Sequence, residues 1–101
     1  MHYLLFYEKI AGYEELQRPY ALDHRNYFEK RAVQGDMLLG GSLEDPMDGS
    51  AVILFEAESA AVVEAFAKAD PYVVHGIVNK WSVRKWDIVV GSKLQDFKGL
   101  V

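Results

Sequence analysis

The sequence predicts a single α+β domain whose elements follow the order strand, helix, strand, strand, helix, strand. The chain has 101 residues, which is enough for one hydrophobic core and too few for two. Apolar residues make up 50% of the chain and aromatic residues 13%, a composition typical of an ordered globular protein. Apolar runs of strand length alternate with segments of helical periodicity.

The first half of the chain begins with a strand and a helix. Residues 3–7 form a continuous apolar run, which predicts a strand, and Gly12 ends the pattern. A helix is expected from Arg18-Pro19, because proline is tolerated at the first helical position, to Gly35, which suits a left-handed cap. One face of this helix carries residues at helical spacing: Tyr20, His24, Tyr27, Phe28 and Arg31.

Two strands joined by a hairpin loop are expected next. Residues 37–43 form the second strand, which the pair Gly40-Gly41 interrupts at a bulge or a close backbone approach. Residues 44–50 contain Asp-Pro and Asp-Gly, both turn signals. Residues 51–56 form the third strand.

The last third of the chain supplies the second helix and the fourth strand. Ser59 is the expected N-cap of a helix that runs to about Ala69. The buried side of this helix is expected to carry Val62, Val63, Phe66 and Ala67. Asp70-Pro71 ends the helix and begins one more short turn, and residues 78–86 alternate as an edge strand does.

This order is that of the ferredoxin-like βαββαβ fold with an antiparallel sheet. The first and third strands are expected in the centre of the sheet, because both runs are apolar on both faces. Two helices cover only one face, so the second face needs another cover. We therefore expect a homodimer with the two sheets face to face. Residues 87–101 are expected to be an extension of the single domain that packs on the dimer, since they are too apolar for a loose tail: Ile88, Val89, Val90, Phe97, Leu100 and Val101.

Composition argues against several classes of function. The net charge of −4 is unfavourable for nucleic-acid binding, and no apolar run approaches the ~18–20 residues that span a bilayer. The absence of cysteine excludes disulfides, thiol nucleophiles and thiolate metal sites, and fits a cytoplasmic location. The N-terminus has no signal-peptide pattern. The three histidines match no metal-ligand spacing, and no nucleotide-binding glycine motif is present, so we expect neither metal nor cofactor.

His24 is the main candidate for chemistry, because it lies on the apolar face of the first helix. Imidazole titrates near neutral pH and suits a general acid or base, although a lone histidine on such a face is more often a core residue. A histidine base usually needs a carboxylate partner. Asp70, at the end of the second helix, is the better candidate, because the adjacent Asp23 points to another side of its helix. The alternative for Asp70 is a purely structural N-cap before Pro71.

The stretch Ala69-Asp70-Pro71-Tyr72-Val73-Val74-His75-Gly76-Ile77, with His24, Gly35 and the run Trp81–Trp86, resembles the YCII family over residues 1 to about 88. The resemblance implies a dimeric α+β barrel and a cleft with a histidine–aspartate pair, here His24 and Asp70. One relative of the family is a dehydrochlorinase that acts on a chlorinated hydroxyquinol. The sequence departs from the family at Gly40-Gly41-Ser42, where relatives often have Gly-Pro.

These observations lead to three functional hypotheses. The first is an enzyme without a cofactor, in which His24 and Asp70 carry out elimination, isomerisation or hydrolysis on a small organic substrate, cyclic or aromatic. The second is a non-catalytic dimeric module that binds a metabolite or a protein partner. The third is a heme or oxygenase activity, because dimeric α+β barrels also include monooxygenases. Candidate substrate-binding residues are Tyr7, Tyr20, Tyr27, Ser42, Tyr72 and His75. The alternative for the aromatic residues is packing in the core and the dimer.

Overall fold

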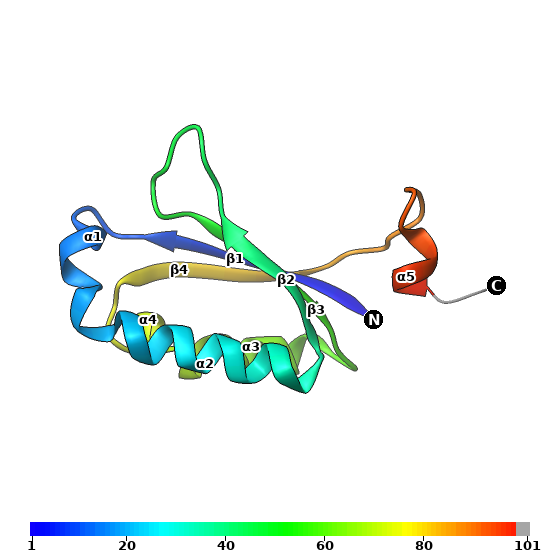
Figure 1. Cartoon of the computed structure of the whole chain (residues 1–101), viewed down its shortest axis with the longest axis horizontal. Helices are drawn as coiled ribbons and strands as arrows, with labels where there is room; N and C mark the ends of the chain where they lie inside the picture. The colour runs from blue at the N-terminus through cyan, green and yellow to red at the C-terminus, as the bar shows by residue number, and fades with distance from the viewer. Residues whose placement is uncertain (99–101) are drawn as a thin grey trace.

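The computed structural model describes residues 1–98 and contains one four-stranded antiparallel sheet (Figure 1). Its strands are β1 (His2–Lys9), β2 (Met37–Ser42), β3 (Ala51–Glu56) and β4 (Val78–Lys85). Their order in the sheet is β2-β3-β1-β4. The first and third strands are therefore central, as predicted, and the ferredoxin-like α+β fold is confirmed.

The main helices lie together on one side of the sheet (Figure 1). They are α2 (Ala21–Gln34), α3 (Ala60–Ala69) and the single turn α4 (Pro71–Val74). Gly35 closes α2 with φ 93°, and Ser59 and Asp70 are the N-caps of α3 and α4, as predicted. A further short helix, α5 (Leu94–Lys98), follows β4.

The connection between β1 and α2 contains more structure than the sequence pattern indicated. After Gly12, a helical turn α1 (Tyr13–Leu16) precedes the 3-10 turn η1 (Arg18–Tyr20), and only then does α2 begin. The expected start of the first helix at Arg18-Pro19 is therefore a separate 3-10 turn. Four residues are too few for a periodic pattern to be visible in the sequence, which explains the missed turn α1.

The core fills the space between the sheet and the helices. Alternate residues of β1 and β3 meet one face of α3, because side chains of a strand point to opposite faces in turn. The central buried residues are Tyr3, Leu5, Tyr7, Ile53, Phe55, Val63, Phe66 and Ala67. The predicted buried face of the second helix is thus confirmed at three positions, while Val62 at its flank is half-buried.

The second face of the sheet carries the remaining strand residues. Leu4 and Phe6 of β1 pair with Leu54 and Val52 of β3 on this face. Phe6 remains 36% exposed and Leu39, which pairs with Leu54, 63% exposed. The helices α2, α3 and α4 lie on the other side of the sheet (Figure 1), so Phe6 and Leu39 stay accessible, although Leu54 on this face is buried.

The bulge in β2 lies earlier than the sequence suggested. The register between β2 and β3 shifts between Met37 and Leu39, and the pair Gly40-Gly41 itself is in regular register with Ile53 and Val52. A Cβ atom at Gly40 would lie 3.4 Å from Ile53, which agrees with the alternative expectation of a close backbone approach.

The segment after β4 packs in part against the domain. Ile88 is buried and the ring of Phe97 makes an edge contact with His2, at 5.9 Å between centroids, whereas Val89 and Val90 are exposed. Leu100 and Val101, which were also expected to pack, lie outside the described residues. Within residues 1–98, no helix is long and apolar enough to cross a bilayer.

We predict that Leu5→Ala lowers the free energy of unfolding by ~2–5 kcal/mol, because it leaves a cavity in the closed core. Leu22→Ala is the matched control, since Leu22 is 65% exposed on α2, and its effect should stay within ~0.5 kcal/mol. Urea unfolding followed by circular dichroism measures both values. Equal losses in the two variants would contradict the assignment of the core.

Candidate active site

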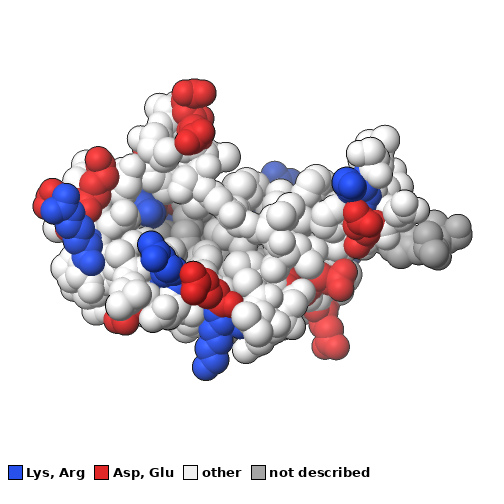
Figure 2. All heavy atoms as spheres, in the orientation of Figure 1, with Lys and Arg blue, Asp and Glu red and all other residues white. Residues whose placement is uncertain are grey.

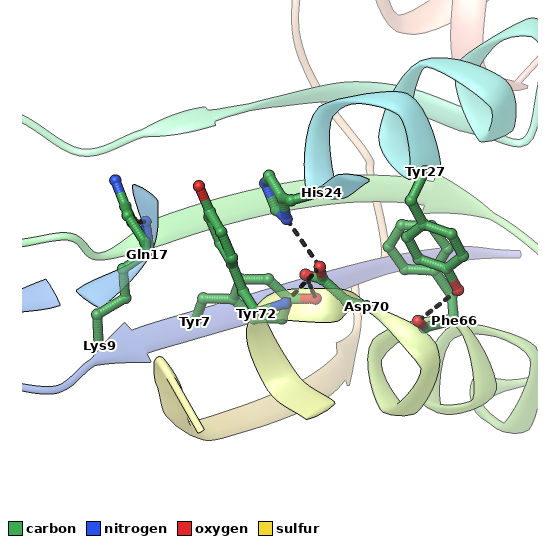
Figure 3. A network of polar contacts seen from close by, with 8 residues as sticks. All are labelled: Tyr7, Lys9, Gln17, His24, Tyr27, Phe66, Asp70 and Tyr72. Atoms are coloured by element: carbon green, nitrogen blue, oxygen red, sulfur yellow. Dashed lines mark hydrogen bonds and ion pairs between the residues drawn. The ribbon is translucent and has the colours of Figure 1, made fainter. Parts of the chain in front are cut away.

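The structure brings His24 and Asp70 into direct contact (Figure 3). His24 projects from α2, and Asp70 lies at the junction of α3 and α4. The distance between His24 Nδ1 and Asp70 Oδ1 is 2.7 Å, a short hydrogen bond of the kind that forms between charged or strongly polar groups. The two residues, 46 positions apart in sequence, thus form the pair that the sequence analysis selected.

Asp70 is fully buried, with 0% of its surface exposed. Its Oδ1 accepts the backbone N–H of Tyr72 at 3.1 Å, and its Oδ2 accepts the hydroxyl of Tyr7 at 2.7 Å. The residue is therefore an N-cap and a histidine partner at once, so the two interpretations of Asp70 do not exclude each other. A buried carboxylate needs such donors to compensate for the loss of water.

This arrangement orients the imidazole of His24. A carboxylate can only accept, so Nδ1 of His24 is the donor to Asp70, and in the neutral imidazole Nε2 is then the acceptor. The imidazole ring stacks on the ring of Tyr72, with 3.8 Å between the ring centroids and 8° between the ring planes. The centroid of the Phe28 ring lies 4.3 Å from that of the imidazole. Packing on two rings and a hydrogen bond together restrict the histidine to one orientation.

A cavity of about 370 Å³ opens beside His24. It lies between α2 and strands β1, β2 and β3, and the space-filling view shows a hollow on this face (Figure 2). Its polar lining residues are Tyr7, Lys9, His24, Glu29 and Ser42. Its apolar walls include Phe28, Met37, Leu38, Leu39 and Ile53. Gly40 and Gly41 also line it, and the missing side chain at Gly40, where a Cβ atom would lie 3.4 Å from Ile53, keeps this wall open.

Lys9 and Glu29 are polar lining residues that the sequence analysis did not single out, and Lys9 is the more buried of the two. It is half-buried at the end of β1 and donates from Nζ to Gln17 Oε1 at 2.9 Å. Burial lowers the pKa of the Lys9 amine below its usual range, while the Asp70 carboxylate acts in the opposite direction. The signal in the sequence was a charged residue that continues the buried alternation Tyr3, Leu5, Tyr7 on the same strand face.

The phenols around Asp70 are held in the neutral form. Burial, and then the nearby Asp70 carboxylate, raise the pKa of the Tyr7 hydroxyl far above its usual value. Burial also raises the pKa of Tyr27 and of Tyr72. Tyr7 can thus donate a hydrogen bond to Asp70 over the whole physiological pH range. In the described part of the chain, no group of three or more acidic or histidine side chains is arranged to hold a metal ion.

Comparison with known proteins supports this fold and identifies the family of the chain. The model of the YCII-related domain matches residues 1–87. The chain belongs to the YCII-related family. A solved structure with a similar fold is the 5-chloro-2-hydroxyhydroquinone dehydrochlorinase from Burkholderia phenoliruptrix AC1100, in complex with 2,5-dihydroxybenzoquinone. It is 21% identical, with a TM-score of 0.71 over 86% of this chain and 94% of that one. No curated protein matches the sequence.

Of the six predicted substrate-binding residues of this YCII-related domain, two line the cavity and four do not. Tyr7 and Ser42 line it, whereas Tyr72 is the stacking partner of His24. Tyr27 donates to the Phe66 carbonyl at 2.7 Å and stacks on its ring. Tyr20 and His75 stack on each other at 3.8 Å, outside the cavity lining.

We predict that Tyr7→Phe lowers the free energy of unfolding by ~1.5–3 kcal/mol at pH 7, because a buried carboxylate loses a donor. The folded wild type keeps the phenol protonated, whereas the unfolded chain releases this proton near the ordinary pKa of 10.0. The advantage of wild type over Tyr7→Phe is therefore complete below pH 10 and falls by about 1.4 kcal/mol per pH unit above it.

Urea unfolding of both proteins at pH 7 and pH 11 measures this difference. Tyr20→Phe is the control, since Tyr20 stacks on His75 and makes no hydrogen bond to Asp70. If the free energies of unfolding of wild type and Tyr7→Phe differ by the same amount at both pH values, Tyr7 is not the buried donor.

Proposed function

We propose that this protein is a small enzyme that uses His24 and Asp70 for acid–base chemistry on a small cyclic or aromatic substrate. The observation that carries the proposal is the free Nε2 of an imidazole whose Nδ1 is bonded to a buried carboxylate, beside an open cavity. This arrangement satisfies the geometric requirements for a general base with an orienting partner.

The chemistry best suited to the pair is proton removal coupled to loss of a leaving group. His24 Nε2 takes a proton from the substrate, the electron pair left behind forms a new double bond, and the leaving group departs with its own bonding pair. The proton then resides on the imidazolium, which the Asp70 carboxylate stabilises. Release of this proton to water returns His24 to its starting form.

The size and lining of the cavity support a ring-shaped substrate. A volume of about 370 Å³ lies at the lower end of the range of small-molecule pockets. Aliphatic and aromatic side chains form most of its walls, and the polar lining residues include His24 and Lys9. The solved relative acts on a chlorinated hydroxyhydroquinone, and a substituted six-membered ring is the substrate class that we propose here.

We predict that wild type, incubated with 5-chloro-2-hydroxyhydroquinone and related halogenated phenols, releases halide and that His24→Gln lowers the rate by ~10²–10⁴-fold. Asp70→Asn should cause a loss of similar size, because the amide no longer fixes the imidazole tautomer. Halide release and product absorbance measure turnover, and circular dichroism confirms folding.

The matched control is His2→Gln, the same substitution at a histidine that contacts Glu56 and Phe97, outside the cavity lining. It should retain the wild-type rate. Turnover that survives in His24→Gln would contradict the catalytic role of the pair. Ligand binding by wild type without product for any compound would instead favour the non-catalytic binding module.

We also propose that the protein is a homodimer in which two sheets pack through their second faces. The support is the apolar surface that the helices leave uncovered, including Phe6 and Leu39. Exposed apolar surface of this kind is unfavourable in water, and an isologous contact would remove it for both copies.

We predict a light-scattering mass of twice 11.5 kDa for wild type at micromolar concentration. Phe6→Asp should shift the mass toward 11.5 kDa, because it places a charge in the contact. Leu22→Asp is the matched control on the outer side of α2 and should remain dimeric. A monomeric wild type would exclude this assembly.

A further inference from the structure

Lys9 occupies an unusual position for a charged residue. It continues the strand face of Tyr7 at the end of β1 and lines the cavity together with His24. The register between β1 and β4 shifts between Glu8 and Lys9, because β4 has one extra residue, Asn79, opposite this end of β1.

The side chain of Lys9 is held on several sides. Its ammonium lies 4.8 Å from the ring centre of Tyr72 and 5.1 Å from that of Tyr13. The methylene stem lies close to the loop before β3, where a Cβ atom at Gly49 would be only 3.0 Å from it. Figure 3 shows Tyr72 between Lys9 and His24, so one phenol ring contacts both groups.

The positive charge of Lys9 has no carboxylate partner among the described residues. Its hydrogen bond goes to the neutral amide of Gln17, and none of the ion pairs includes it. Asp70 acts on it only at longer range, since its oxygens are bonded to His24, Tyr7 and Tyr72. Glu29, the carboxylate in the cavity lining, is exposed and forms no ion pair with it.

A half-buried charge without an ion-pair partner is unfavourable, and burial already lowers the pKa of this amine. An anion in the cavity would compensate for the charge and keep the amine protonated. Aromatic faces and the Gln17 amide hold the ammonium in place without neutralising it, which leaves its charge available to a ligand.

We propose that Lys9 binds an anionic oxygen of the substrate, so that the cavity selects rings that carry an ionised hydroxyl or carboxylate. This inference rests on the proposed function and names the substrate class of the same site. Lys9 then holds the ring at one end while His24 Nε2 acts on a proton at another position, which gives each basic residue a separate role.

The test compares two ring compounds of similar size. The hydroxyl groups of 2,5-dihydroxybenzoquinone are conjugated with its carbonyls, which makes them acids that are ionised at pH 7. Hydroquinone has ordinary phenols, which are neutral at pH 7 because their pKa values lie near 10. Isothermal titration calorimetry of both compounds requires no turnover, so its result is independent of the assay for His24.

We expect Lys9→Met to weaken the binding of 2,5-dihydroxybenzoquinone by roughly 10- to 100-fold, the effect of one charged hydrogen bond. The affinity for hydroquinone should change less than about threefold, which is smaller than the effect of losing one charged hydrogen bond. Lys9→Arg should retain most of the preference for the anion, because it keeps the charge. Lys68→Met, the same substitution on the exposed side of α3, should match wild type for both compounds.

The salt dependence of the wild-type protein provides a second test if Lys9→Met does not fold. The dissociation constant for 2,5-dihydroxybenzoquinone should rise with sodium chloride, and that for hydroquinone should not. A wild type that fails to bind the anion, or binds both compounds equally, would overturn the inference. So would an equal loss of both ligands in Lys9→Met, which indicates a structural role. A loss of turnover in His24→Gln would still support the acid–base function in each of these cases.

Discussion

The buried carboxylate of Asp70 is the interaction on which the site and much of the helical layer depend. It ends α3, caps α4, receives the hydroxyl of Tyr7 from the central strand and holds His24 of α2. A carboxylate with no exposed surface is stable only when donors replace the water it has lost. Elements far apart in sequence must therefore meet at this point, and the same contact that joins them also orients the imidazole.

The aromatic residues serve this centre as well as the core. Tyr72 and Phe28 restrict the ring of His24. Tyr27 donates its hydroxyl to the backbone carbonyl of Phe66 and stacks on the Phe66 ring. Rings provide large, rigid surfaces, so a small domain can hold a polar pair in a defined geometry without a second layer of sheet. The high aromatic content of the chain, which the sequence analysis assigned to packing in the core and the dimer as one alternative, thus includes direct support of the candidate site.

Much of the fold could be predicted because its signals are local. Apolar runs marked the first three strands and alternation marked the fourth, Gly35 and Ser59 marked helix ends, and Asp70-Pro71 marked the turn between two helices. The turn α1 was too short to leave a pattern, and the bulge in β2 depends on its pairing with β3, which no single strand reveals. Lys9 was missed for a similar reason, since its burial results from contacts with Tyr13, Tyr72 and the loop at Gly49.

The sequence by itself determined the order of the elements, the central position of the first and third strands, and the choice of His24 and Asp70 as the residues of interest. These follow from periodicity, turn chemistry, the resemblance of the motifs and the absence of cysteine, all of which can be seen along the chain. Only the tertiary structure decided that Asp70 bonds both the imidazole and Tyr7, and that the glycine pair and Lys9 face one cavity with His24. Distances between side chains on different elements depend on how the helices pack on the sheet, and that packing arises from the whole core at once.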